Sequence, residues 1–277
     1  MTTLGERIIE RIEAASFAEL AAVAFLALDD APADREDPER VVRALERALA
    51  RKNQFAASEP ALRGVIHDAT CAMFDAIARG EPREESMKLA AEKLRAAFRA
   101  VLGDAPREVA SASYSPELQL AVLGLSIDSL REPILDVGCG PDALLVEHLR
   151  AAGKSARGID FQIDGTDWLT FDYGAARWGT IVSHLGFSLH FMHQEMKSSE
   201  VAFEYARAYM RIVKSLAPGG TFAYVPGLPF IEAMLPPNAL RVVRVPLAPE
   251  LVTSAVASVQ EATGLVLDAA THVTARP

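Results

Sequence analysis

Two glycines follow a short apolar run in the segment Ile134-Leu135-Asp136-Val137-Gly138-Cys139-Gly140, and a helical run from Ala143 to Ala152 comes directly afterwards. We interpret the apolar run as a buried strand that ends in a glycine turn. Gly138 and Gly140 let the backbone turn sharply and approach a ligand closely, while the start of the helix offers unpaired amides. A strand, a glycine turn and a helix in this order predict a nucleotide-type binding crevice.

A second strand with an acidic tip follows this helix. The segment Ala156-Arg157-Gly158-Ile159-Asp160-Phe161 is typical of a short strand that ends at Asp160. An acid at that position is well placed to accept hydrogen bonds from both hydroxyls of a ribose. We therefore expect Asp160 to bind a ribose, with Phe161 beside the same ligand.

The charge of Asp136 indicates which nucleoside the crevice binds. Gly138, Gly140 and Ala143 also fit the loose dinucleotide motif, which by itself is weak support for any one cofactor. A carboxylate two residues before Gly138 would repel a pyrophosphate over the turn, whereas it would not repel a cationic amino-acid group. The sequence therefore favours a positively charged nucleoside over a nicotinamide dinucleotide.

Two spaced motifs resemble those of one enzyme family. The segment Leu135 to Gly140 is similar to the opening motif of the class I S-adenosylmethionine-dependent methyltransferases. Leu216-Ala217-Pro218-Gly219-Gly220 is similar to the turn into their fifth strand, and Trp178 to His184 is similar to their fourth strand. The resemblance covers about residues 115 to 230 and implies S-adenosylmethionine as the cofactor.

The resemblance also implies roles for individual residues. The glycine turn would hold the methionine end, Asp160 would hold the ribose, and Asp167 with Trp168 would hold the adenine. The complete set that we expect at the cofactor is Asp136, Gly138, Cys139, Gly140, Asp160, Phe161, Asp167, Trp168, Ser183 and Gln119. Of these, Cys139 is expected to fill a small space rather than to act as a nucleophile, because no His or Lys neighbours it in sequence.

The chain departs from the family pattern at two places. Asp142 stands where the third glycine is common, and we expect it to cap the helix that begins at Ala143. The interval from Asp160 to Thr180 is short, so this edge of the sheet is expected to be reduced. In the later motif, we expect Pro218 to end a helix and the two glycines to form a tight turn.

Three histidines, His184, His190 and His193, follow the fourth strand, where ligands meet the ends of strands. If the methyl acceptor is a hydroxyl, one of them could remove its proton as a general base. Ordinary packing is the alternative. We predict no metal here, since neither an acid nor a Cys lies at a familiar zinc spacing.

Aromatic residues on either side of this region are candidates for the acceptor pocket. Tyr114 precedes the first strand, in a region that often covers the ligands in the resembled family, and Tyr224 and Phe230 follow the fifth strand. The alternative for Tyr114 is packing at a linker, and for the other two it is the core. For Gln119, a solvated helix face competes with ligand contact.

The pattern of apolar residues divides the chain into a helical domain, 1–108, and an α/β domain, 109–277. The first part predicts five helices, the third beginning with Asp37 as cap and Pro38, and the fourth ending at Gly80. Short apolar runs then alternate with helices, which predicts a Rossmann-like, mostly parallel sheet. After Leu240 we expect a strand to Val245, a helix over Pro249 to Ala262 and a strand over Val266 to Val273. We expect the helical domain to cover the acceptor site or to mediate dimerisation.

Composition narrows the partners and the compartment. A formal net charge of −9, with Lys and Arg scattered among acids, is unfavourable for nucleic acid. The 2 cysteines, Cys71 and Cys139, form neither a disulfide framework nor a paired zinc spacing, so a reducing cytoplasm is expected. No apolar run is long enough to span a membrane or to form a signal peptide. We predict no metal site, and His67, within an apolar helical stripe, is assigned no role.

These patterns together predict an S-adenosylmethionine-dependent methyltransferase that acts on a small molecule. Ser183-His184-Leu185-Gly186 replaces the Asn-Pro-Pro-Tyr type of tetrad expected for methylation of nucleobase amines, and the histidines mildly favour an oxygen acceptor in a metabolite or natural-product intermediate. Two alternatives remain open. One is a non-catalytic protein that binds S-adenosylmethionine or serves in assembly, and the other is a nicotinamide-dependent oxidoreductase.

Overall fold

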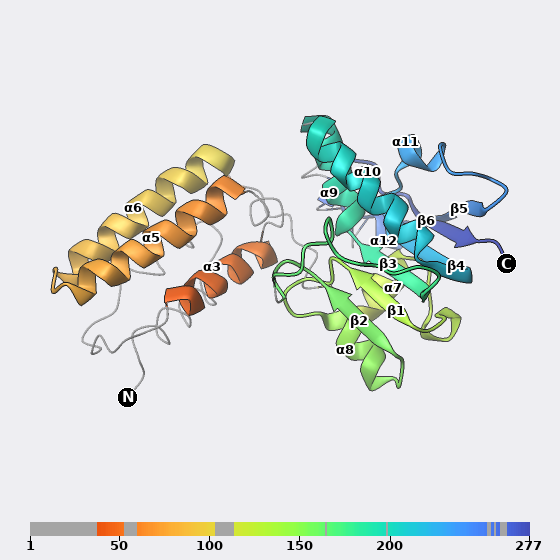
Figure 1. Ribbon diagram of the computed structural model, residues 1–277, viewed down its shortest axis with the longest axis horizontal. Coiled ribbons are helices and arrows are strands. Elements are labelled where there is room, and N and C mark those ends of the chain that lie inside the picture. The colour runs from red at the N-terminus through yellow and green to blue at the C-terminus, as the bar shows by residue number, and fades with distance from the viewer. Residues whose placement is uncertain are drawn as a thin grey trace. The chain divides into compact units, whose positions relative to one another are not determined.

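The chain forms two compact units, Met1–Ala110 and Ser111–Pro277, so the division falls close to the predicted boundary after residue 108 (Figure 1). The computed structural model describes residues 38–52, 60–102, 114–163, 165–197, 199–253, 256–257, 259–260 and 265–277. The first two predicted helices, Asp37 and the segment 103–113 lie outside the described residues.

The described part of the first unit consists of helices with apolar stripes that pack on one another. They are α3 (Pro38–Lys52), α5 (Pro60–Ala78) and α6 (Arg83–Leu102). Their buried core consists largely of aliphatic side chains and includes Val41, Leu45, Leu49, Leu62, Ile66, Met73, Leu94 and Phe98. Gly80 has a φ of 85° and donates its N–H to the carbonyl of Ile77, so it ends α5 as predicted. The all-helical prediction is confirmed for the described residues.

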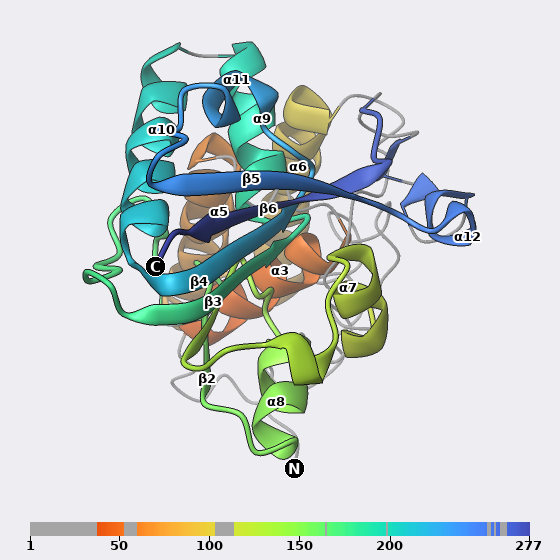
Figure 2. The ribbon, with the colours of Figure 1, turned by 90° about the vertical axis from the view of Figure 1, so that its right-hand side faces the viewer.

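The second unit is built on a six-stranded sheet in the order β2-β1-β3-β4-β6-β5. Its strands are β1 (Ile134–Val137), β2 (Ala156–Ile159), β3 (Trp178–His184), β4 (Leu216–Val225), β5 (Leu240–Pro246) and β6 (Ala269–Ala275). The first four are parallel, whereas β6 runs antiparallel to both β4 and β5. Figure 2 shows this antiparallel edge, with β6 between β4 and β5. The predicted α/β class with a mostly parallel sheet is confirmed.

Helices connect and cover these strands. They are α7 (Pro116–Val122), the 3-10 helix η1 (Ile127–Ser129), α8 (Leu144–Ala151), α9 (Phe187–Lys197), α10 (Ser199–Lys214), α11 (Pro229–Glu232) and α12 (Pro249–Thr253). The contacts of α8 are with β2 and α7, while α9 packs on β3, β4 and α10. The described helices include none that is both long and apolar enough to cross a membrane.

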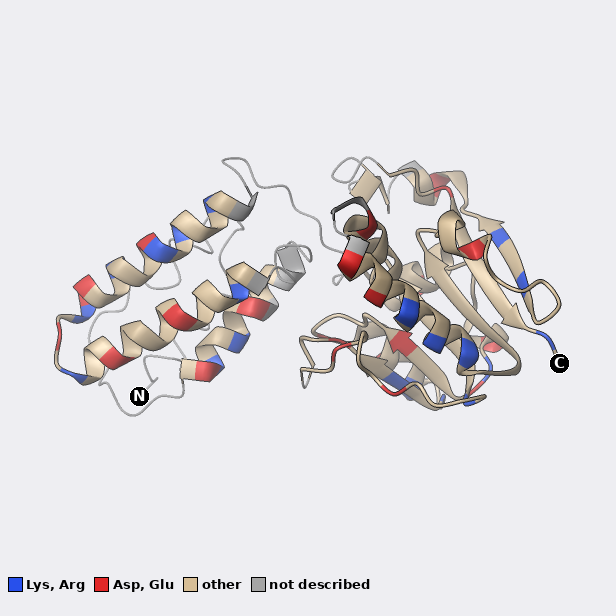
Figure 3. Ribbon diagram, turned by 45° about the horizontal axis from the view of Figure 1, so that its top comes forward, with Lys and Arg blue, Asp and Glu red and all other residues tan. Residues whose placement is uncertain are grey.

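Charged residues of both signs are interspersed along α5 and α6 (Figure 3). On α10 the two signs are sorted instead, with Glu200 in the first turn and Arg211 and Lys214 in the last. This order is favourable because the helix dipole is positive at its first turn and negative at its last. The interspersed charges of α5 and α6 agree with the scattered Lys and Arg residues of the sequence.

The edge of the sheet beside β2 is reduced, as predicted. Among the described residues between β2 and β3, the one β-type pairing is an isolated bridge between Asp160 and Ile163, and no helix occurs. This leaves β2 as the edge strand.

The Pro-Gly-Gly segment has a different role from the one predicted. The helix α10 already ends at Lys214, so Pro218 does not end a helix. Trp178 pairs with Leu216 and Thr180 pairs with Thr221, so residues 217–220 bulge out of β4 opposite Gly179. A Cβ atom on Gly220 would lie 2.6 Å from the carbonyl oxygen of Trp178, which explains why a glycine occupies this position.

The C-terminal elements follow the predicted order with shifted bounds. The strand β5 covers the predicted run from Leu240, and α12 begins at Pro249 as predicted. The strand β6 begins at Ala269, later than the predicted Val266, because residues 265–268 lie outside the sheet.

Candidate functional site

The strand order places a crevice at the ends of β1 and β3. The chain leaves β1 for β2 on one side and returns to β3 on the other, so the order reverses beside β1. Ligands of open α/β sheets bind outside the carboxyl ends of the strands at such a switch point. The residues that follow β1, β2 and β3 are therefore the ones that can contact a ligand together.

The turn after β1 packs backbone to backbone on the turn after β3. Gly138 and Gly140 have φ angles of 83° and 72°. A Cβ atom on Gly138 would lie 3.1 Å from Cα of Gly186 and 3.3 Å from Cζ3 of Trp168, and one on Gly186 would lie 3.1 Å from the carbonyl oxygen of Gly138. The two turns thus approach so closely that neither Gly138 nor Gly186 has room for a side chain. Sequence reasoning missed Gly186, although its position directly after the fourth strand was a signal.

Ser183 connects the two turns. Its buried hydroxyl donates to the carbonyl of Val137 at 2.7 Å and accepts the N–H of Phe187 at 2.9 Å. The side chain therefore fixes the end of β1 against the start of α9. Ser183 was predicted to contact the cofactor, and that contact stays a prediction beside the positioning contact that the structure shows.

The start of α8 is not capped as predicted. The helix begins at Leu144, and Ala143 occupies the capping position in a left-handed conformation with a φ of 47° and no side-chain capping hydrogen bond. Asp142 is exposed. The expectation that Asp142 caps a helix beginning at Ala143 is wrong, because the left-handed residue separates Asp142 from the first helical residue.

Asp160 is tied to the glycine turn by its carboxylate. One oxygen accepts the N–H of Gly140 at 3.0 Å, and the other accepts the N–H of Gln162 at 2.9 Å. Burial raises the pKa of Asp160, and the two backbone hydrogen bonds act in the opposite direction. A carboxylate has about four lone-pair sites, so about two stay open for the hydroxyls of a ribose. The adjacent Phe161 is 39% exposed.

Asp136 is the most unusual group of the site. Its side chain is 2% exposed, and its Oδ2 has no hydrogen-bond partner among the described residues. Burial raises the pKa of Asp136 to about 8, and the charge of Asp160 acts in the same direction. A buried carboxylate without a partner is costly unless a positive charge comes beside it. The site thus fits a cationic ligand group and disfavours a phosphate.

Cys139 fills a small space, as predicted. Its Sγ lies 3.7 Å from the carbonyl oxygen of Gly140, and a Cβ atom on Gly158 would lie 2.5 Å from that sulfur. Burial raises the pKa of the Cys139 thiol. The neutral thiol therefore packs β2 against the glycine turn.

The pair predicted to hold an adenine lies beside this turn. Trp168 packs on Gly138, and its ring lies 5.4 Å from the ring of His190 and 6.4 Å from that of Phe187. One carboxylate oxygen of Asp167 accepts the N–H of Leu169 at 2.8 Å and so stabilises the local turn. The adenine contact of Asp167 and Trp168 stays a prediction.

Two of the predicted catalytic histidines are buried and neutral. Burial lowers the pKa of His184 to about 3, and burial together with the charge of His193 lowers the pKa of His190 to about 4. A general base works best when its pKa is near the working pH, so these two are poorly matched to that role. His193 is half-buried on α9. Among the described residues, the three histidines do not form a metal-binding group.

Tyr114 and Gln119 line the approach to β3. The ring of Tyr114 lies 5.2 Å from that of His184, and the Gln119 amide donates to the carbonyl of Tyr114 at 2.8 Å. Gln119 is 6% exposed, so the alternative of a solvated helix face is wrong. Within the described part of the chain, Nε2 of His184 has no hydrogen-bond partner. This buried edge can therefore bind a polar group of a ligand.

Tyr224 and Phe230, which were predicted to line the acceptor pocket, differ in burial. Tyr224 is fully buried in β4, and its hydroxyl lies 2.9 Å from the hydroxyl of Tyr209 and 2.9 Å from Oε1 of Glu232. This network places Tyr224 in the core, which corrects its assignment to an acceptor pocket. Phe230 is 39% exposed and packs edge-on against Phe191 at 5.1 Å.

Comparison with known proteins gives distant matches. No family model and no curated protein matches the chain. Among solved structures it is similar to the N-methyltransferase NodS from Bradyrhizobium japonicum WM9, at 19% identity over 58% of this chain and 95% of that one, with a TM-score of 0.35. The cyclase SpnF matches at 13% identity over 60% and 84%, with a TM-score of 0.34. The CurJ carbon methyltransferase matches at 12% identity over 99% and 92%, with a TM-score of 0.28.

Proposed function

We propose that this protein is an S-adenosylmethionine-dependent methyltransferase that acts on a small molecule. The observation that carries the proposal is the buried Asp136 carboxylate, whose Oδ2 lacks a hydrogen-bond partner among the described residues and which lies beside Asp160. A site with two carboxylates and a glycine turn favours a ligand that combines a ribose with a positive charge. The α-amino group of S-adenosylmethionine would offset the buried charge of Asp136.

The bound cofactor would supply an electrophilic methyl group. The residues of the chain hold and orient the reactants, and alignment of this kind can supply much of the acceleration of a bimolecular reaction. Asp160 fixes the turn through Gly140 and would accept the ribose hydroxyls. The close contact between Gly138 and Gly186 holds the turn after β1 against the turn after β3.

A nicotinamide-dependent oxidoreductase is the weaker alternative. Dinucleotide-binding sheets consist of two parallel mononucleotide-binding halves. Here the half beyond β3 contains the antiparallel β6, and the turn after β1 is flanked by Asp136 and Asp160. A diphosphate would add negative charge to this pair.

For the acceptor, the support comes from the edge formed by Tyr114 and His184. Both side chains lie at the end of β3, where Nε2 of His184, lacking a partner within the described residues, could bind a polar group. Oxygen methylation would need a proton acceptor, and His193 is the half-buried histidine that could serve. We propose that the protein works in the cytoplasm, where Cys71 and Cys139 form no disulfide.

A second candidate is a protein that binds S-adenosylmethionine without catalysis. The neutral, buried His184 and His190 favour it, because neither is suited to remove a proton near neutral pH. The helical unit would then act through protein contacts. In the first proposal, this unit covers the acceptor or forms a dimer.

Calorimetric titration of the full chain with S-adenosylmethionine, S-adenosylhomocysteine and NAD⁺ tests the cofactor. We expect the first two to bind and NAD⁺ not to bind. The exposed Asp128 offers a matched control, since Asp128→Asn removes one carboxylate outside the site. Binding of NAD⁺ alone would contradict the proposal. Methyl transfer from labelled cofactor to a metabolite extract then separates the enzyme from the non-catalytic candidate.

A further inference from the structure

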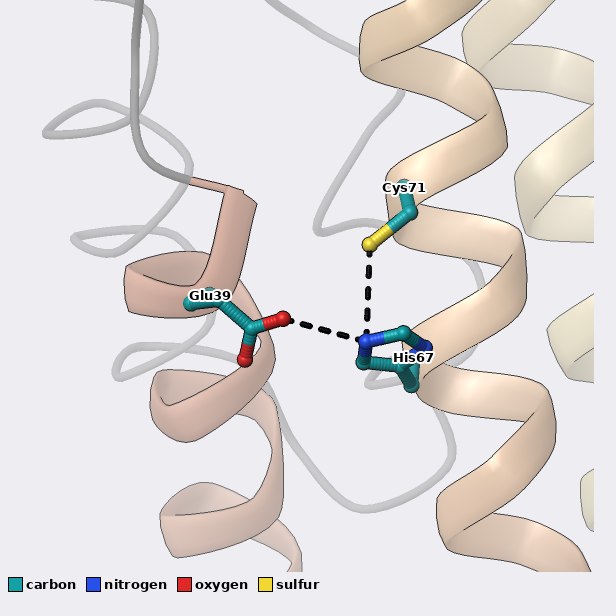
Figure 4. A group of neighbouring side chains, drawn as sticks. All are labelled: Glu39, His67 and Cys71. Atoms are coloured by element: carbon teal, nitrogen blue, oxygen red, sulfur yellow. Dashed lines mark hydrogen bonds and ion pairs between the residues drawn. The ribbon is translucent and has the colours of Figure 1, made fainter.

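Three potential metal ligands converge in the helical unit, and none of them has a part in the proposed cofactor site. Glu39 lies in the first turn of α3, while His67 and Cys71 lie one turn apart on α5. Nε2 of His67 is 3.0 Å from Oε1 of Glu39 and 3.8 Å from Sγ of Cys71. One ligand atom from each residue lies within 4.8 Å of the others. Figure 4 shows the three side chains pointing toward one another from the two helices.

The separations match a tetrahedral metal site. Bonds of about 2.0 Å to nitrogen, 2.1 Å to oxygen and 2.3 Å to sulfur at tetrahedral angles would place N and S about 3.5 Å apart and N and O about 3.4 Å apart. The observed 3.8 Å and 3.0 Å differ from these by less than about 0.5 Å, a distance that side-chain rotation can supply. All three residues are exposed or half-buried, so an ion can reach them from solvent.

A fourth side chain orients the central ligand. Nδ1 of His67 lies 3.2 Å from Oδ1 of Asp68. Histidines that bind metals usually donate the other ring N–H to a carboxylate, which fixes the ring and directs the lone pair of the ligating nitrogen. With its proton on Nδ1, His67 directs Nε2 toward Glu39 and Cys71.

We propose that Glu39, His67 and Cys71 bind a zinc ion that joins α3 to α5, with water in the fourth position. Thiolate and imidazole ligands with one carboxylate are a donor set that zinc prefers. The Cys71 thiol loses its proton as the metal binds, and His67 binds the metal through its unprotonated Nε2. This site was not predicted from the sequence, because Glu39 lies on another helix, 28 residues from His67.

Cobalt titration of the full chain, after treatment with a chelator, tests this site. Cobalt reports the ligands, because a thiolate gives an intense near-ultraviolet charge-transfer band and tetrahedral geometry gives strong visible bands. We expect both, and we expect one equivalent of zinc to abolish them. Cys71→Ser should remove the charge-transfer band, while His67→Gln and Glu39→Gln should weaken binding.

Two further variants make the test specific. Glu92→Gln removes an exposed carboxylate from α6 and matches the charge change of Glu39→Gln, so it should leave zinc affinity unchanged. Asp68→Asn should weaken it by roughly tenfold to a hundredfold, the usual effect of losing a residue that orients a ligand. Far-ultraviolet circular dichroism checks that each variant is folded.

The cobalt spectra and the zinc affinities distinguish the outcomes that support the site from those that overturn it. Loss of the charge-transfer band in Cys71→Ser and its retention in Glu92→Gln would support the site. A wild-type spectrum with weak octahedral bands and no thiolate band would overturn it, as would equal zinc affinity in the wild type and in folded Cys71→Ser.

Discussion

Titratable side chains of the two units lie in opposite environments. In the helical unit, Glu39 and His67 form an ion pair with side chains that are 48% and 49% exposed. In the α/β unit, Asp136, His184 and His190 are buried, and burial moves the pKa of each toward its neutral form. Water screens the charges of Glu39 and His67. The low dielectric of the protein interior instead determines the protonation of Asp136, His184 and His190. A charged ligand should therefore change the free energy of the buried site in the α/β unit more than that of the exposed group in the helical unit.

Glycines show the same contrast. Gly64, inside α5, has no atom within 4 Å of an added Cβ, whereas Gly138 would meet backbone at 3.1 Å. The first glycine is replaceable, and the second is required by the turn.

The largest expected effect is that of Gly138→Ala. A left-handed φ and a tight contact together should destabilise the α/β unit by about 2 kcal/mol or more and abolish cofactor binding. Both tryptophans, Trp168 and Trp178, lie in this unit, so urea unfolding followed by tryptophan fluorescence reports on it. Gly153→Ala is the matched control, because Gly153 has a φ of 78° and open space around it. Equal destabilisation by the two substitutions would refute the close packing.

Asp160→Ala should have the next largest effect. It removes a charged acceptor of ribose hydroxyls, which should weaken S-adenosylhomocysteine binding by about 1.5 to 3 kcal/mol. Calorimetry measures this against Asp128→Asn. Part of the loss in affinity should come from a less ordered glycine turn, because Asp160 also accepts the N–H of Gly140. Unchanged affinity would remove Asp160 from the site.

The stability of the α/β unit should depend on pH through Asp136. Its folded pKa of about 8 is above the ordinary value of 3.8, so the folded state holds a proton that the unfolded state releases. The stabilisation is complete below the unfolded pKa and is lost as pH rises through about 8. His184 and His190 add the same slope to the wild type and to Asp136→Asn, so the difference between the two profiles reports Asp136 alone. Between about pH 6.5 and 8, urea unfolding should therefore show the stability of the wild type falling relative to that of Asp136→Asn.

Gly64→Ala should have the smallest effect and the opposite sign. Alanine in a helix interior is favoured over glycine, so the helical unit should gain about 0.5 to 1 kcal/mol. Thermal unfolding followed by circular dichroism measures it. Gly80→Ala, at a φ of 85°, should lose stability instead. A loss in Gly64→Ala would show a contact that α5 makes through this position.

Much of the fold follows from local pattern. The glycine turn, the reduced edge after Asp160 and the boundaries at Pro38 and Gly80 depend on residues whose backbone preferences are strong. The bulge at Pro218 was not predictable, because it depends on the register between β3 and β4.

The acidic residues of the candidate site could be predicted from the sequence, but the contacts of its side chains could not. The roles of Asp136 and Asp160 could be predicted because both residues lie near the ends of predicted strands. The protonation of His184 could not be predicted, because it depends on burial, which only the fold determines. The core position of Tyr224 depends on Tyr209 and Glu232, which are distant from one another in sequence. The zinc ligand set likewise needed two helices to be placed side by side.

Proton release during cofactor binding tests the central claim most directly. Asp136 is largely protonated at about pH 7, and a cationic ligand group beside it should make it ionise. Calorimetric titration with S-adenosylhomocysteine in buffers of different ionisation enthalpy measures the protons exchanged. We predict that about one proton is released in the wild type and none in Asp136→Asn. Equal release in both proteins, or binding by NAD⁺ in place of the nucleoside, would contradict the account.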